Sequence, residues 1–98
     1  MGDKMSLKLG VIGLGRWGPN HVRNFGAFPD SEVVAAADLD EGSRNRLGSH
    51  YPEIELFDDY TRLLEKDGLD AVVVATPTGT HHEVVKRALE SGKHVLCE

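Results

Sequence analysis

Residues 7–20 read LKLGVIGLGRWGPN, and this stretch decides the fold. An apolar run over residues 7–13 leads directly into three glycines spaced G-x-G-x-x-G, namely Gly13, Gly15 and Gly18. Pro19 follows, and proline suits the first turn of a helix because its φ is already fixed there. A glycine-rich turn alone is a weak signal. One that ends a strand and opens a helix is the context of the dinucleotide-binding fingerprint.

Each glycine of this motif has a physical role in that interpretation. Gly13 permits the tight turn, Gly15 lets the backbone approach a pyrophosphate, and Gly18 lets helix and strand pack closely. The following helix offers unpaired N–H groups and a partial positive charge to phosphates. A tight turn without a ligand is the alternative. A Walker-type phosphate loop is excluded, because no G-K-[ST] follows the glycines.

Further apolar runs predict the rest of the sheet. They lack the polar alternation of half-solvated strands, as expected of parallel strands that are covered on both faces. These runs cover residues 32–38, 70–76 and 93–98, with a weaker run at 54–57 placed near a sheet edge. Helical patterns separate them. The fold class is therefore α/β, a Rossmann-type doubly wound parallel sheet.

Local signals suggest where the helices begin and end. Asp40 is the expected cap of one helix, and Asp58 or Asp59 caps the next, which Gly68 ends. A capping box of Thr80 and Glu83 is expected to open the last helix. Gly92 is expected to end this helix. Its predicted buried face consists of Val84, Val85, Ala88 and Leu89.

The composition of the chain limits the classes of function that it can have. Ninety-eight residues with 40% hydrophobic content form one small globular domain, and a net charge of −5 argues against nucleic-acid binding. The longest apolar stretch, residues 71–75, is too short for a membrane span. No secretory signal is evident and Cys97 is the single cysteine, so a cytoplasmic location is expected. Residues 1–6 are interpreted as a lead-in or tag remnant.

Asp38 ends the second apolar run, about 20 residues after the glycines. A carboxylate there can accept hydrogen bonds from the hydroxyls of an adenosine ribose. It would also repel the 2′-phosphate of NADP, by up to about 4 kcal/mol at 4 Å and an effective dielectric of about 20. Arg44 and Arg46 follow on the next predicted helix. NAD is therefore the predicted cofactor and NADP the less favoured one. Helix capping is the alternative role for Asp38, but Asp40 is better placed for it.

Four motifs together resemble a known family. They are the glycine fingerprint, Asp58-Asp59-Tyr60, the strand end at Ala75-Thr76-Pro77-Thr78, and residues 92–98, GKHVLCE. In this order and spacing they resemble the N-terminal nucleotide-binding domain of the glucose–fructose oxidoreductase, inositol dehydrogenase and rhizopine-catabolism (Gfo/Idh/MocA) family. The resemblance covers residues 7–98.

The resemblance implies an NAD(P)-dependent dehydrogenase that moves a hydride between the nicotinamide and a secondary alcohol of a sugar, cyclitol or nucleotide sugar. By analogy, Leu14, Gly15, Arg16 and Trp17 line the pyrophosphate, and Asp38 with Leu39 holds the adenosine end. Thr76, Pro77 and His81 match positions near the nicotinamide ribose. Glu98 matches the glutamate of the family's E-K-P motif.

The chain departs from the family after Glu98, where the E-K-P lysine would follow. We therefore expect a domain truncated after its fifth strand, without a substrate domain, without an assignable catalytic residue and inactive alone. The exposed last strand is expected to favour self-association. A non-catalytic nucleotide-sensing or assembly module is the alternative function, and a domain for another adenosine ligand, such as S-adenosylmethionine, is a third.

Two other features are weak signals for chemistry. His81 and His82 are adjacent and diverge by about 100° on a helix, so no metal site is expected. Cys97 lacks an identifiable partner base, which favours a packed thiol over a nucleophile.

Overall fold

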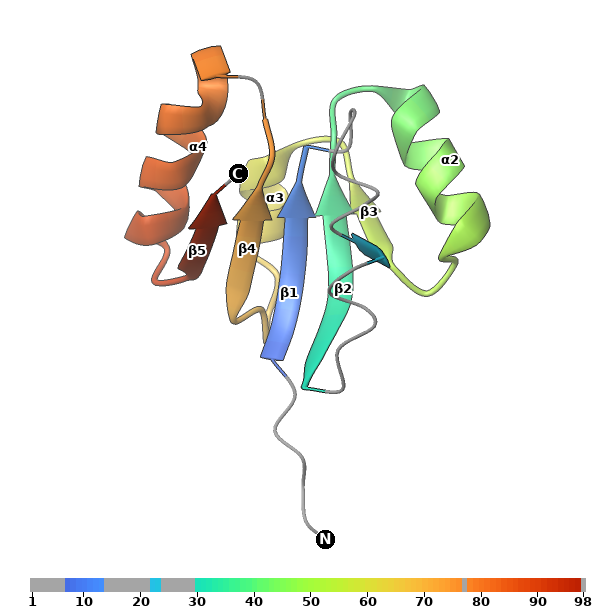
Figure 1. Cartoon of the computed structure of the whole chain (residues 1–98), viewed down its shortest axis with the longest axis horizontal. Helices are drawn as coiled ribbons and strands as arrows, with labels where there is room; N and C mark the ends of the chain where they lie inside the picture. Colours follow the sequence, from blue (N-terminus) through green and yellow to red (C-terminus); the bar gives the residue numbers. More distant parts are fainter. Residues whose placement is uncertain (1–6, 14–21, 24–29, 77, 98) are drawn as a thin grey trace, which may run out of the picture.

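The computed structural model describes residues 7–13, 22–23, 30–76 and 78–97. In this part of the chain five strands form one parallel sheet in the order β3-β2-β1-β4-β5 (Figure 1). The strands are β1 (Leu7–Ile12), β2 (Ser31–Ala37), β3 (Glu55–Phe57), β4 (Ala71–Val74) and β5 (His94–Cys97). The predicted doubly wound sheet is confirmed, with the weak third run at one edge.

The strand order reverses direction at β1. The chain runs outward from β1 through β2 to β3, then returns to place β4 on the other side of β1. Ligands of open α/β sheets bind at such a switch point, beyond the carboxyl ends of the strands. The topology therefore directs attention to the ends of β1, β2 and β4.

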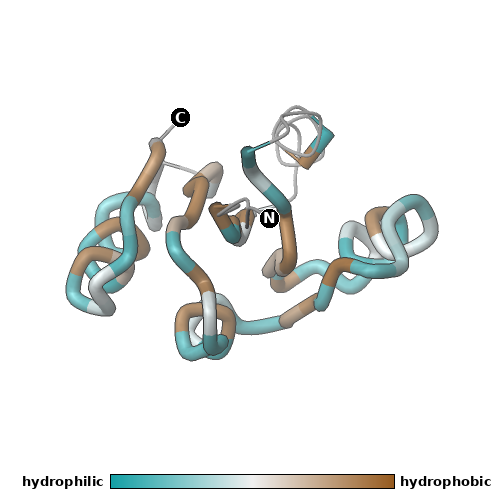
Figure 2. The backbone as a smooth tube through the Cα atoms, turned by 90° about the horizontal axis from the view of Figure 1, so that it is seen from below, coloured by the Kyte–Doolittle hydropathy of each residue, from teal (hydrophilic) through white to brown (hydrophobic). Residues whose placement is uncertain are grey.

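Helices cover both faces of the sheet. They are α2 (Glu41–His50), α3 (Tyr60–Leu64) and α4 (Thr78–Glu90), and residues 22 and 23 are also helical. Val22 and, from α2, Leu47 belong to one buried cluster. Side chains of α3 and α4 belong to a second buried cluster on the opposite face of the sheet. Figure 2 shows hydrophobic residues concentrated in the strands between these helices.

The second buried cluster is built around α3. Leu63 is fully buried, and a side chain added at Gly10 of β1 would lie 2.9 Å from its Cδ2. Opposite Gly10 the register with β2 shifts by one residue, so that Val34 and Ala35 both face this cluster. Because Gly10 has no side chain, Leu63 can pack directly against the central strand β1.

Both predicted helix caps at the carboxyl edge are present. Asp40 caps α2 by accepting the Ser43 N–H at 2.9 Å. Of the two candidates for α3, Asp59 is the cap, and it accepts the Thr61 N–H at 2.9 Å. The predicted end of α3 at Gly68 was wrong. The helix ends at Leu64, because the chain must return early enough to bury Leu69 before β4.

The start of α4 also differs from the prediction. The helix begins at Thr78, so Thr80 lies inside it and the capping box was wrong. Glu83 instead pairs with Arg87, one turn further on, at 3.7 Å. The Thr-Pro-Thr-Gly-Thr sequence offers more than one capping residue, and the helix begins at the second of its three threonines.

The other end of α4 follows the prediction. Gly92 adopts a φ of +79° and donates to Leu89 O, while Lys93 N–H donates to Ala88 O at 3.2 Å. These two bonds form a Schellman motif. The predicted burial of Leu89 was wrong, because this side chain is 59% exposed on the outward side of the helix. Val84 and Ala88 are buried, and Val85 is partly buried.

At the other edge of the described sheet lies β5. Its Leu96 is 44% exposed, and the neighbouring α4 carries the exposed Leu89. Self-association through this edge remains a prediction.

Candidate functional site

The carboxyl ends of three central strands are tied together by backbone hydrogen bonds. Gly13 N–H donates to Ala37 O at 2.9 Å, and Ala75 N–H donates to Ile12 O at 2.8 Å. The segments that leave β1, β2 and β4 therefore lie side by side at the switch point. Most of the described candidate residues belong to these segments.

Gly13 is the residue at which two segments approach most closely. Its φ is +96°, and a Cβ there would lie 2.9 Å from the carbonyl carbon and oxygen of Ala75 and 3.0 Å from the Thr76 nitrogen. Real side chains essentially never make such contacts with backbone atoms. Both the turn and the contact with the end of β4 therefore require glycine.

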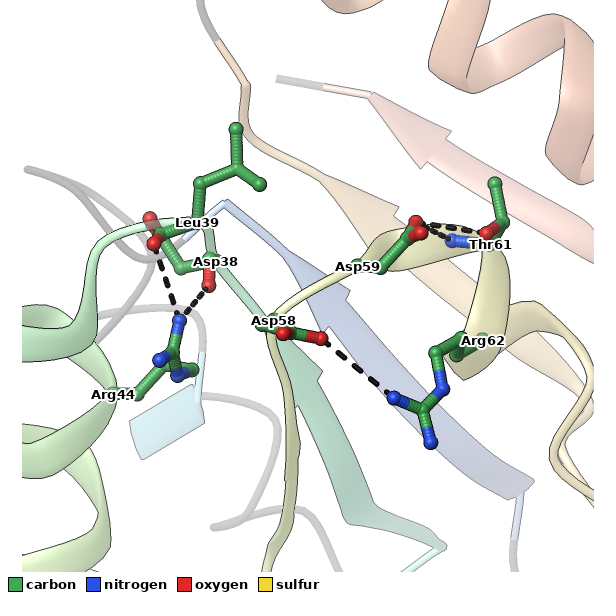
Figure 3. A network of polar contacts seen from close by, with 7 residues as sticks. All are labelled: Asp38, Leu39, Arg44, Asp58, Asp59, Thr61 and Arg62. Atoms are coloured by element: carbon green, nitrogen blue, oxygen red, sulfur yellow. Dashed lines mark hydrogen bonds and ion pairs between the residues drawn. The ribbon is translucent and has the colours of Figure 1, made fainter.

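Asp38 follows β2, at the start of a turn that leads into α2. Its N–H donates to Phe57 O at 3.1 Å, and its Oδ1 accepts the Asp40 N–H at 2.8 Å. Figure 3 shows Arg44 beside this turn, with Nη1 donating to the carbonyl oxygens of Asp38 at 2.8 Å and Leu39 at 3.2 Å. The Leu39 side chain is 88% exposed. The turn thus presents a half-buried carboxylate next to an exposed apolar side chain.

Thr76 follows β4 on the other side of Gly13. Its Oγ1 is buried, and it has no hydrogen-bond partner within the described part of the chain. A buried hydroxyl without a partner is costly, and it often marks a place where a ligand or water supplies one. His81 lies one turn into α4 and is half-buried.

Five of the predicted site residues lie in described segments. Gly13, Asp38, Leu39 and Thr76 gather at the carboxyl edge of the sheet, and His81 lies on the helix that leaves it. The remaining predicted residues lie outside the described residues, namely Leu14, Gly15, Arg16, Trp17, Gly18, Pro77 and Glu98.

Sequence reasoning missed the contact that Arg44 makes. It placed Arg44 on the second helix, which is correct, but assigned it no structural role. A signal exists in the spacing: an arginine four residues after an N-cap is within reach of the turn that precedes the helix. Which carbonyls it meets depends on side-chain geometry that the sequence does not specify.

Two carboxylates at this edge are stabilised in their ionised form. Hydrogen bonds from the backbone and side chain of Ser43 lower the pKa of Asp40, and those from Thr61 lower the pKa of Asp59. Burial raises the pKa of Tyr60, with a further contribution from Glu83. Figure 3 shows Asp59 turned toward Thr61, while Asp58 faces Arg62 at 3.9 Å. Asp58 and Asp59 thus serve α3 and do not form a reactive pair.

A family model described as oxidoreductase family, NAD-binding Rossmann fold, matches residues 7–98. The chain belongs to the Gfo/Idh/MocA family. Inositol 2-dehydrogenase 1 from Saccharopolyspora erythraea is 38% identical over 96 residues, covering 96% of this chain and 28% of that protein. The uncharacterised oxidoreductase YrbE from Bacillus subtilis is 36% identical over 91% of this chain and 26% of its own length.

Solved structures of Gfo/Idh/MocA relatives agree with the fold. Scyllo-inositol dehydrogenase from Lactobacillus casei with bound NAD(H) and scyllo-inositol matches with a TM-score of 0.86 and 28% identity, covering 94% of this chain and 27% of that one. A mutant 3-ketoreductase from Actinomadura kijaniata with TDP-benzene and NADP matches with a TM-score of 0.85 and 34% identity, over 94% and 29%. This chain spans about a quarter of the length of these relatives.

Membrane spans and metal clusters are both absent from the described residues. None of their helices is long and apolar enough to cross a membrane. They also contain no group of three histidine, cysteine, aspartate or glutamate side chains arranged to hold a metal ion.

Proposed function

We propose that the carboxyl edge of this sheet binds NAD(H) in preference to NADP(H), within a dehydrogenase that acts on a secondary alcohol. The observation that carries the proposal is the close approach of Gly13, which follows β1, to the end of β4 at the switch point, with Asp38 at the end of the adjacent strand. A glycine after the first strand and an acidic residue after the second are what the first part of a dinucleotide-binding site requires, which supports the proposal.

The described residues fit such a cofactor. A carboxylate has about four acceptor positions, so the Asp38 side chain can accept ribose hydroxyls besides the Asp40 N–H. Leu39 offers apolar surface beside it for an adenine ring. The buried Thr76 hydroxyl would gain the hydrogen-bond partner that it lacks among the described residues. When bound, the nicotinamide of NAD supplies hydride chemistry, and these side chains bind and orient the dinucleotide.

The preference for NAD rests on the charge of Asp38. An ionised carboxylate against a 2′-phosphate is repulsive, whereas the same carboxylate accepts hydrogen bonds from a 2′-hydroxyl. Arg44 is a candidate counter-ion for such a phosphate, but its Nη1 already donates to two carbonyls of the turn. The charge that faces the ribose is therefore mainly that of the Asp38 carboxylate, which favours NAD over NADP.

The remaining assignments follow from family membership. We propose that Leu14, Gly15, Arg16 and Trp17 contact the pyrophosphate, and that Gly18 completes the glycine motif by letting helix and strand pack closely. Thr76, Pro77 and His81 are proposed to lie near the nicotinamide ribose, and Glu98 is proposed to correspond to the glutamate of the family's E-K-P motif. The substrate class, a sugar, cyclitol or nucleotide-sugar alcohol, is supported by the inositol dehydrogenases among the relatives. We assign no proton-transfer role to any residue of this chain.

Calorimetric titration with NADH and NADPH tests the proposal. Wild-type protein should bind NADH more tightly, and Asp38→Ala should weaken NADH binding by about tenfold to a hundredfold, because hydrogen bonds to a charged group are lost. The same variant should have more similar Kd values for NADH and NADPH than the wild type has. Asp58→Ala is the matched control, since Asp58 is an exposed acid after β3 that faces Arg62. No saturable binding by the wild type, or equal effects of the two variants, would refute the proposal.

A further inference from the structure

Arg44 lies on α2, but its guanidinium binds the turn before that helix. Nη1 donates to both successive carbonyl oxygens of the turn, Asp38 O at 2.8 Å and Leu39 O at 3.2 Å (Figure 3). For two successive carbonyls to meet one nitrogen, the backbone must bend at Leu39, and a bend is present there. The bend exposes Leu39, whose side chain points away from Arg44.

The helix that carries Arg44 is firmly placed. Leu47 of α2 is buried in the first core cluster, and the buried Ser43 hydroxyl donates to the Asp40 cap at 2.9 Å. Arg44 itself is half-buried. A charged donor anchored on a packed helix holds carbonyl groups more strongly than a neutral one does.

Asp38 is thereby restrained from several directions. Its N–H is bound to Phe57 O, its Oδ1 to the Asp40 N–H, and its carbonyl to Arg44. Restraints of this kind increase affinity because less conformational freedom is lost when a ligand binds.

We propose that Arg44 is a positioning residue for cofactor specificity, which fixes the 38–39 turn so that the Asp38 carboxylate is held ready for the adenosine ribose. The inference rests on the proposed function of this edge. Arg44 acts through Asp38 and does not contact the cofactor. A direct contact between Arg44 and a 2′-phosphate is the competing arrangement, and the two predict opposite effects on specificity.

The test compares variants by calorimetric titration with NADH and NADPH. Arg44→Ala should raise the Kd for NADH about five- to tenfold, the size expected when a charge-assisted hydrogen bond is lost through a neighbour. The Kd for NADPH should rise less, so the preference for NADH narrows. Arg44→Lys keeps a charged donor of similar reach and should stay within about threefold of wild type.

Arg46→Ala is the matched control. It removes the same charge from the same helix, but Arg46 donates to Ser43 Oγ at 3.2 Å and not to the turn. Its Kd for NADH should remain within about twofold of wild type, as expected for a screened surface charge. Thermal unfolding of each variant confirms that the proteins compared are folded.

A double-mutant cycle separates positioning from a general structural effect. If Arg44 acts through Asp38, adding Arg44→Ala to Asp38→Ala should raise the Kd for NADH by less than about twofold. Independent, multiplicative losses would overturn the inference. A larger loss for NADPH than for NADH in Arg44→Ala would also overturn it, in favour of direct phosphate contact.

The behaviour of the wild type separates failure of the proposed function from failure of the role of Arg44. Absence of saturable NADH binding by wild-type protein would overturn the proposed function and this inference with it. Normal NADH binding by the wild type, with an unchanged Kd in Arg44→Ala, would overturn this inference alone.

Discussion

Replacing Gly13 with alanine tests the geometry on which the site depends. The new Cβ would lie 2.9 Å from the Ala75 carbonyl atoms, and these are backbone atoms that cannot rotate away. The φ of +96° adds backbone strain. A non-glycine residue in that region costs about 1–2 kcal/mol, and forced overpacking costs about 1–3 kcal/mol more. Gly13→Ala should therefore lower the free energy of unfolding by about 2–5 kcal/mol.

That loss is large for a domain of this size. A chain of this length has a total stability of about 5–15 kcal/mol. Each kcal/mol corresponds to about 4–8 °C in Tm, so a fall of about 10 °C or more is expected. The assay is urea and thermal unfolding followed by circular dichroism, with wild type and variant at the same pH.

Two other glycines separate strain from contact. Gly92 has a φ of +79° but no atom within 4 Å of the position that a Cβ would take, so Gly92→Ala should cost only the strain, about 1–2 kcal/mol. Gly79 has no positive φ and equally open surroundings within α4. Gly79→Ala should be neutral or stabilising by up to about 1 kcal/mol. Equal losses in Gly13→Ala and Gly92→Ala would refute the close approach of Gly13 to β4.

Two further predictions concern the same edge of the sheet. Hydrogen bonds hold the pKa values of Asp40 and Asp59 below 3.8, so their ionised forms add stability above about pH 4, and this is lost as the pH falls through the lowered values. Between about pH 5 and about pH 2.5, the urea midpoint should therefore fall less steeply with decreasing pH in an Asp40→Asn, Asp59→Asn double variant than in the wild type. The same pH dependence of the midpoint in both proteins would contradict the role of the caps. Thr76→Val removes the buried hydroxyl that has no hydrogen-bond partner among the described residues, so it should stabilise the free protein by about 1 kcal/mol while weakening NADH binding. A loss of stability in that variant would show that the hydroxyl has a partner.

The sheet could be predicted because its signals are local. The apolar runs of β1, β2, β4 and β5 end within two residues of the observed strands, and parallel strands that are covered on both faces need no polar alternation. The cap at Asp40 and the helix end at Gly92 could also be predicted, because a capping residue or a residue with positive φ acts on its immediate neighbours. The Rossmann order then follows from right-handed crossovers and the position of the glycine turn.

The errors occurred where competing local signals or tertiary packing decide the outcome. Three threonines near the start of α4 could each cap it, and the sequence does not rank them. The end of α3 depends on where Leu69 must enter the core, and the exposure of Leu89 depends on how α4 lies against the sheet. The Arg44 contact with two carbonyls needs the rotation of α2 about its axis, which only the packed structure provides.

An NMR titration with NADH tests the location of the site most directly. On uniformly ¹⁵N-labelled protein, amide shifts should concentrate at Gly13, Asp38, Leu39 and Thr76, at the carboxyl edge of the sheet. Amides at the amino ends of the strands, Ser31, Asp70 and His94, should not move. Saturable shifts confined to the first group would support a cofactor site at the carboxyl edge. Shifts at the second group with Gly13 and Asp38 unchanged, or no shifts at all, would contradict it.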